Sequence, residues 1–91
     1  MIVARRFNIN GIVQGVGYRF FAQRAAAKHQ VLGYVRNLPD GRVEAWAEGH
    51  QESVEGFKKE LAAGPAFSQV EQVEEINVEP SGSYSSFRIE R

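Results

Sequence analysis

The residues of this chain that are best suited to chemistry lie between Gly11 and Arg19, in the sequence Gly-Ile-Val-Gln-Gly-Val-Gly-Tyr-Arg. Gly15 and Gly17 free the neighbouring backbone N–H groups from side-chain interference, so these groups can converge on an anion. Arg19 follows at the expected start of a helix, where its guanidinium can bind a phosphate group through paired hydrogen bonds. The helix dipole favours acidic residues in the first turn, so an arginine there is locally unfavourable. A residue that is unfavourable for local structure without structural gain indicates a functional role. The stretch is typical of an anion-binding turn, although glycines between a strand and a helix also serve as plain turn residues.

Asn37 is the second candidate site residue, and its interpretation depends on the fold. Asparagine close before Pro39-Asp40-Gly41 is an ordinary way to begin a turn, which is the simpler explanation. If a crossover helix connects the first two strands, however, both strands run parallel and end at the same edge of the sheet. Asn37 then shares the helix-covered side with Val35, and it meets the glycine turn in space. We therefore expect Arg19 and Asn37 to be neighbours.

Apolar residues alternate along several segments, as in half-buried strands, and follow helical spacing in two others. Pro39-Asp40-Gly41 separates two strands, and Gly64-Pro65 ends the second helix. Gly56 lies inside that helix and should cost about 1 kcal/mol relative to alanine, which leaves the helix dependent on tertiary packing. The expected elements are a strand over 2–13, a helix over 18–29, strands over 31–37 and 42–48, a helix that starts at His50 and ends before Gly64, a strand over 70–79 and a short strand around 87–89.

This order of elements predicts an α+β fold, the ferredoxin-like β-α-β-β-α-β sandwich. We expect an antiparallel sheet with two helices on one face and a short extra C-terminal strand, the second strand being peripheral in the sheet. The length suffices for one compact domain and not for two, so we expect a single domain over residues 1–91.

Composition narrows the possible partners. The chain has 11 basic and 11 acidic residues and no cysteine. The balanced charge argues against nucleic acid, and the lack of cysteine removes disulfides, thiolate nucleophiles and the commonest structural zinc sites. No apolar segment approaches the roughly 20 residues of a membrane span, and no secretion signal is recognisable. We expect a cytoplasmic monomer that binds neither membranes nor nucleic acid and uses no metal or cofactor.

The remaining polar and aromatic side chains have simpler explanations. Neither histidine has a partner at metal-ligand spacing, so we assign them no role beyond packing or capping. The strand glutamates, Glu44 and Glu48 among them, are interpreted as outward-facing and solvated. Tyr34 and Trp46 could stack bases as in RNA-recognition domains, but the basic and aromatic run of those domains is missing. We expect Tyr34 and Trp46 to pack across neighbouring strands.

The two candidate segments together resemble the signature blocks of the acylphosphatase family. The first block is Gly11-x-Val13-Gln14-Gly15-Val16-x-Tyr18-Arg19, and the second is Gly33-Tyr34-Val35-Arg36-Asn37-x-x-x-Gly41-x-Val43, followed by Gly49. The likeness extends over essentially all 91 residues, including Gly64-Pro65 and the ending Ser86-Phe87-Arg88-Ile89. Two long blocks at this separation are far more specific than either block alone.

The resemblance implies an enzyme that hydrolyses the carboxyl–phosphate bond of acyl phosphates, releasing a carboxylate and inorganic phosphate without a metal. It assigns phosphate binding to Arg19 and to the backbone amides from Gln14 to Tyr18. It assigns to Asn37 the holding of the attacking water. The amides in question belong to Gln14, Gly15, Val16, Gly17 and Tyr18.

The chain departs from the family pattern at two places. Tyr18 stands where phenylalanine is more common, so its hydroxyl must reach solvent or find a partner. His29-Gln30 stands where relatives commonly have Leu-Gly, which removes an apolar contact and the favoured glycine C-cap. Both departures bear on stability more than on chemistry.

No serine, cysteine or histidine nucleophile is evident near the candidate site, which favours direct attack by water over a covalent phosphoenzyme. Arg19 and the amides of residues 15–19 would hold the phosphoryl oxygens while Asn37 orients water in line with the scissile bond. The same fold also serves non-catalytic modules, so a small-anion-binding or nucleic-acid-binding module is the alternative. A domain of a larger carbamoyl-transfer enzyme is a further alternative, which a chain of one domain disfavours.

Overall fold

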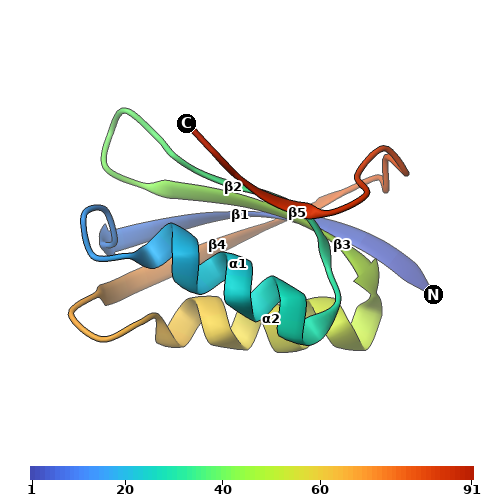
Figure 1. Cartoon of the computed structure of the whole chain (residues 1–91), viewed down its shortest axis with the longest axis horizontal. Coiled ribbons are helices and arrows are strands. Elements are labelled where there is room, and N and C mark those ends of the chain that lie inside the picture. The colour runs from blue at the N-terminus through green and yellow to red at the C-terminus, as the bar shows by residue number, and fades with distance from the viewer.

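The computed structural model describes residues 1–91, and its elements follow the predicted order (Figure 1). Their bounds lie close to those expected from the sequence, and the second helix follows directly after a strand, with His50 as its N-cap. The elements are β1 (Ile2–Ile12), α1 (Tyr18–His29), β2 (Leu32–Asn37), β3 (Val43–His50), α2 (Gln51–Ala63), β4 (Gln69–Val78) and β5 (Phe87–Glu90).

All five strands form one sheet in the order β4-β1-β3-β2-β5. β1 pairs antiparallel with β3 and β4, and β2 pairs antiparallel with β3. Both helices pack against the same face of this sheet and leave the other face open (Figure 1). The ferredoxin-like prediction is confirmed, and β5 adds one parallel pair to an otherwise antiparallel sheet.

The expected peripheral position of the second strand is wrong. β5 pairs along β2, with Phe87 opposite Gly33 and Glu90 opposite Arg36, so β2 lies between β3 and β5. A strand of four residues is enough to cover the exposed edge of β2, because its backbone groups pair with the unpaired N–H and C=O groups there. As a result, the end of β5 lies beside the end of β2.

Aromatic side chains hold the sheet and the second helix together in the core. Phe57 of α2 contacts Phe7 of β1 and Phe87 of β5, with ring centroids 6.3 Å and 5.5 Å apart in edge-on arrangements. Fully burying one such side chain contributes about 1.5–3 kcal/mol to stability. The largest side chains that are fully buried are those of Tyr18, Phe7, Phe57, Ile9, Leu61, Val13, Val35, Val43 and Val54.

The contact between the two helices explains the glycine inside α2. A Cβ atom added at Gly56 would come within 2.7 Å of the His29 imidazole ring, so the ring of α1 occupies the space that any side chain there would need. His29 also bonds through Nε2 to the carboxylate of Glu60 on α2. The propensity cost of Gly56 is therefore offset by a close helix–helix contact, and His29 has a packing role as expected. Neither helix is long and apolar enough to cross a membrane.

The prediction that the glutamates of β3 are solvated is wrong for Glu44 and Glu48, which are 7% and 5% exposed. Glu44 forms an ion pair with Arg36 on the neighbouring strand. Glu48 accepts hydrogen bonds from the indole of Trp46 and from the backbone and hydroxyl of Ser81. Burial of a carboxylate is tolerated because charged and polar donors compensate for the lost hydration. Arg36 and Ser81 lie outside the strand that carries both glutamates, so the alternation along that strand could not reveal these donors.

The open face of the sheet carries an aromatic cluster. The rings of Tyr34 on β2 and Trp46 on β3 are stacked with their centroids 6.5 Å apart. Tyr84, in the connection before β5, packs at 6.1 Å against both rings. The expected cross-strand packing is confirmed, and it includes a third ring that covers the pair.

Candidate active site

The turn between β1 and α1 presents an uncapped helix N-terminus. Gly15 and Gly17 have φ values of 75° and 77°, in the left-handed region that residues with a Cβ atom rarely adopt. A Cβ atom at either position would meet nothing within 4 Å, so these glycines are required for backbone conformation and not for space. Gly17 is the N-cap, no side chain caps the helix, and its first turn contains no acidic residue. The free N–H groups and the helix dipole therefore favour an anion here.

Arg19 lies in this first turn and is held by the last strand. Its Nη1 atom donates a hydrogen bond to the backbone oxygen of Glu90 on β5, at 3.1 Å. No carboxylate forms an ion pair with Arg19. The guanidinium is therefore oriented by a neutral carbonyl group and keeps its positive charge available for a ligand.

Asn37 is the last residue of β2 and shares the helix-covered side of the sheet with Val35. Its side-chain oxygen Oδ1 is buried and has no hydrogen-bond partner within the protein. A buried acceptor without a partner costs about 1–3 kcal/mol, so its presence calls for a ligand or a water molecule. Asn37 is thus a polar group that is poised to receive a hydrogen bond from a bound species.

The two segments meet as the topology argument predicts. The turn after β1 and the end of β2 lie at the same end of the molecule (Figure 1). Gly15, Gly17, Arg19 and Asn37 all line one cavity of about 160 Å³. The other lining residues are Val13, Tyr18 and Phe20.

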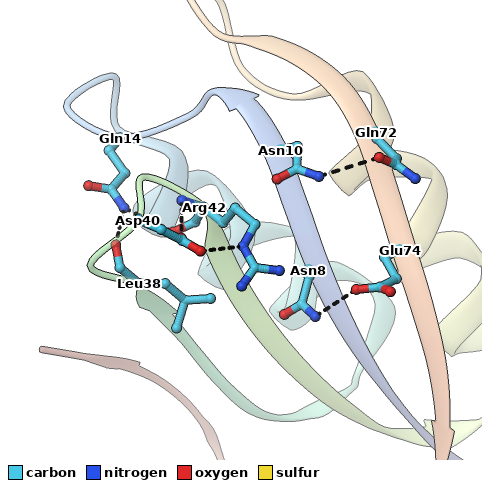
Figure 2. Close-up of polar contacts among 8 residues, drawn as sticks. All are labelled: Asn8, Asn10, Gln14, Leu38, Asp40, Arg42, Gln72 and Glu74. Atoms are coloured by element: carbon cyan, nitrogen blue, oxygen red, sulfur yellow. Dashed lines mark hydrogen bonds and ion pairs between the residues drawn. The ribbon is translucent and has the colours of Figure 1, made fainter.

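Gln14 and Val16, which were also predicted to contribute, do not line this cavity. Val16 packs its side chain against the hydrophobic core. The side chain of Gln14 reaches the loop between β2 and β3, where Nε2 donates to the backbone oxygens of Leu38 and Arg42 at 2.8 and 2.9 Å (Figure 2). Gln14 therefore ties the glycine turn to the hairpin that carries Asn37, a positioning role that the sequence did not indicate.

The β2–β3 turn is itself fixed by a local contact. Asp40 accepts hydrogen bonds from the backbone N–H and the guanidinium of Arg42 (Figure 2). The interpretation of Asp40 as a turn residue is confirmed. Because Gln14 bonds to this same turn, it fixes the position of the glycine turn relative to Asn37.

Tyr18 has a buried partner on the second helix. Its hydroxyl donates a hydrogen bond of 2.7 Å to the backbone oxygen of Leu61. That oxygen lies in the last turn of α2, and the residue four positions later is Pro65, which has no N–H to offer. Burial raises the pKa of the Tyr18 hydroxyl far above its ordinary value, so it remains a donor at all ordinary pH values. The Tyr18 hydroxyl therefore has a partner within the protein and does not reach solvent.

The cavity is suited to holding a small anion next to an ordered water molecule. Its polar groups are backbone amides, one guanidinium and one carboxamide, and no acidic side chain lines it. No group of three or more His, Asp or Glu side chains comes together anywhere in the structure in a way that could hold a metal ion. Such a donor set binds a phosphoryl group through hydrogen bonds and charge.

Comparisons with known proteins point to one family. The sequence matches the family model described as Acylphosphatase over residues 5–89. The acylphosphatase of Solibacter usitatus is 49% identical over 86 residues, which cover 94% of this chain and 88% of that protein. The crystal structure of acylphosphatase from Bacillus subtilis has a TM-score of 0.94 at 34% identity, with 100% of both chains covered. Full-length HypF in its phosphate- and nucleotide-bound form gives a TM-score of 0.89 at 32% identity, where 100% of this chain matches 12% of HypF.

Proposed function

The chain belongs to the acylphosphatase family, and we therefore propose that it hydrolyses acyl phosphates to a carboxylate and inorganic phosphate at the cavity between β2 and the glycine turn. In this proposal Arg19 and the backbone amides of the turn from Gln14 to Tyr18 bind the phosphoryl group. Asn37 binds the attacking water molecule. The turn amides are those of Gln14, Gly15, Val16, Gly17 and Tyr18.

One observation supports the assignment of roles more than any other. The buried Oδ1 of Asn37 has no protein partner, and it shares its cavity with the guanidinium of Arg19, which forms no ion pair. A water molecule that donates one hydrogen bond to Oδ1 turns a lone pair toward a phosphoryl group bound by Arg19. The two side chains thus provide one place for each reactant.

The proposed reaction is a direct displacement at phosphorus. The water oxygen forms a bond to phosphorus while the bond between phosphorus and the acyl oxygen breaks, and its electron pair leaves on the carboxylate. A carboxylate departs without protonation because it is a weak base. One proton of the water passes to a phosphoryl oxygen, so a dianionic acyl phosphate becomes a carboxylate monoanion and dihydrogen phosphate. Positioning and charge stabilisation by Arg19 and the amides lower the barrier.

The test separates binding from turnover, with benzoyl phosphate as substrate and inorganic phosphate as competitive inhibitor. Arg19→Ala should abolish both phosphate inhibition and hydrolysis. Asn37→Ala should lower kcat by about 100-fold or more and leave the inhibition constant of phosphate nearly unchanged. Arg88→Ala and Asn77→Ala change the same residue types at exposed positions on other strands and serve as matched controls.

Three results would contradict this proposal. Absence of hydrolysis by the wild-type protein would favour a non-catalytic anion-binding module. Normal turnover by Asn37→Ala would remove its role in holding water. Loss of activity in the presence of a chelator would require a metal that the proposed reaction does not use.

The proposal extends to the setting of the reaction. We propose a single domain over residues 1–91 that acts in the cytoplasm as a monomer on this small molecule, with no nucleic acid or membrane as partner and no cofactor. The equal numbers of basic and acidic residues support it, since nucleic-acid binding relies on an excess of positive charge. Light scattering at micromolar concentration tests the monomer, and a stable dimer would contradict it.

A further inference from the structure

Two larger clefts flank the phosphate cavity, and the exposed side chain of Phe20 contributes to both. The cleft of about 700 Å³, here named the helix cleft, runs along α1 from Gly17 to Lys28 and reaches the α2–β4 connection at Pro65. The cleft of about 510 Å³, here named the C-terminal cleft, shares only Phe20 with the helix cleft. Besides Phe20, the C-terminal cleft is lined by Arg19, Asn37, Ile89 and Arg91.

The direction of attack selects between the two clefts, an argument that rests on the proposed function. In an in-line displacement the water and the leaving carboxylate lie on opposite sides of phosphorus. Asn37, which holds the water in this proposal, lines the C-terminal cleft and not the helix cleft. The glycine turn lies between the β2–β3 loop that follows Asn37 and the α2–β4 loop (Figure 1). The acyl group therefore points away from Asn37, past Gly17, into the helix cleft.

The helix cleft combines apolar walls with one uncompensated positive charge. Phe20, Phe21 and Pro65 supply apolar surface. Lys28 forms an ion pair with Glu60, which cancels its charge locally. Arg24 is exposed and forms no ion pair with any acidic residue.

The spacing along α1 sets the length of acyl group that reaches this charge. Gly17 and Arg24 are seven residues apart, which is two turns or about 10 Å along the helix axis. An acyl group whose carbonyl carbon lies near Gly17 passes along Phe20 and brings its far end within reach of the flexible Arg24 side chain. An anionic group at that end would find a partner there.

We propose that the helix cleft is the acyl subsite and that Arg24 determines specificity, favouring acyl groups that carry an anionic group at the end away from the phosphate. The apolar wall at Phe20 and Pro65 accepts the body of the acyl group. Arg24 pairs with the distal carboxylate or phosphate. The C-terminal cleft is left to the water molecule.

The test compares benzoyl phosphate with 4-carboxybenzoyl phosphate, which adds one carboxylate at the far end of the same ring. The measured quantity is the ratio of kcat/KM for the charged substrate to that for the neutral one. Arg24→Gln should lower this ratio about fivefold, the size expected for one partly exposed ion pair, while benzoyl phosphate remains a substrate. Arg24→Glu should lower the ratio further. Arg91→Gln removes the cation of the C-terminal cleft and should leave the ratio unchanged.

Each outcome bears on one proposal. An unchanged ratio in both Arg24 variants, or a lower ratio in Arg91→Gln, would overturn the assignment of the acyl subsite. Turnover of benzoyl phosphate by the wild-type protein would show in that case that the proposed function still stands. If the wild-type protein hydrolyses neither substrate, the proposed function itself fails. Hydrolysis of benzoyl phosphate by Arg24→Gln also shows that this variant is folded.

Discussion

Replacement of Tyr18 by phenylalanine tests whether one hydrogen bond joins the candidate active site to the second helix. Tyr18→Phe removes a hydroxyl and retains the ring, which is 1% exposed and fills the core beneath the glycine turn. The Leu61 oxygen then loses its donor. No backbone group can replace that donor, because Pro65 stands where the next N–H of the helix would be.

The loss of stability in Tyr18→Phe should exceed that of an ordinary hydrogen bond, because the Leu61 oxygen has no alternative backbone donor. An ordinary intramolecular hydrogen bond contributes about 1 kcal/mol net, and a buried acceptor left without a partner costs about 1–3 kcal/mol. We expect Tyr18→Phe to lower the free energy of unfolding by about 2 kcal/mol, and the melting temperature of a domain of this size by roughly 10 °C. Hydrolysis of benzoyl phosphate should persist, because the backbone N–H of residue 18 is retained.

Urea unfolding followed by circular dichroism measures the change, with the midpoint and slope compared between variants. Tyr84→Phe is the matched control, since the Tyr84 hydroxyl makes no hydrogen bond within the protein, and its midpoint should not move. Equal stability of Tyr18→Phe and the wild-type protein would refute the reasoning. It would mean that the Leu61 oxygen reaches water, and that the end of α2 is less tightly closed than the structure shows.

Two further predictions concern stability. Burial alone would raise the pKa of Glu48, but hydrogen bonds from Ser81 and its neighbours outweigh burial and lower it, so this carboxylate stabilises the folded state above its unfolded pKa of about 4.3. The free energy of unfolding should therefore fall as the pH drops through this range. Glu48→Gln should weaken this pH dependence, whereas Glu52→Gln, at an exposed position, should leave it intact. Urea titrations between pH 3 and 7 measure the difference. Gln30 ends α1 with a φ of 57°, a left-handed conformation that glycine adopts at lower cost than glutamine. Gln30→Gly should therefore raise the free energy of unfolding by about 0.5–1 kcal/mol in the same assay. A gain of equal size in Gln30→Ala would show that the left-handed conformation is not the cause.

The elements of the fold were predictable because each is encoded by neighbouring residues. The alternation that ends at Val13 and the helical spacing that begins at Tyr18 are local patterns, and so is the stop at Gly64-Pro65. The position of β5 was not predictable, because a strand of four residues carries too little pattern to specify its neighbour. Its pairing with β2 is decided by an unpaired strand edge that exists only in the folded chain.

The candidate site shows the same division. The meeting of Arg19 and Asn37 follows from the handedness and direction of a crossover, so topology alone was sufficient to predict it. The role of Gln14 could not be predicted, because its partner at Leu38 is 24 residues away and is selected by the angle of a hairpin. The partner of Tyr18 is 43 residues away, and nothing near Tyr18 in the sequence indicates the free carbonyl group.

The sequence by itself determined the helices and strands, the left-handed glycine turn and the two side chains proposed to act on the substrate, because periodicity and turn conformation are properties of short segments. The tertiary structure decided the surroundings of those side chains: Arg19 bonds to the Glu90 oxygen, and Asn37 has a buried oxygen without a protein partner. It also decided the burial of Glu44 and Glu48. A hydrogen bond depends on distances of tenths of an ångström and on angles between elements that are distant in the chain. Those distances and angles exist only once the sheet and both helices have packed.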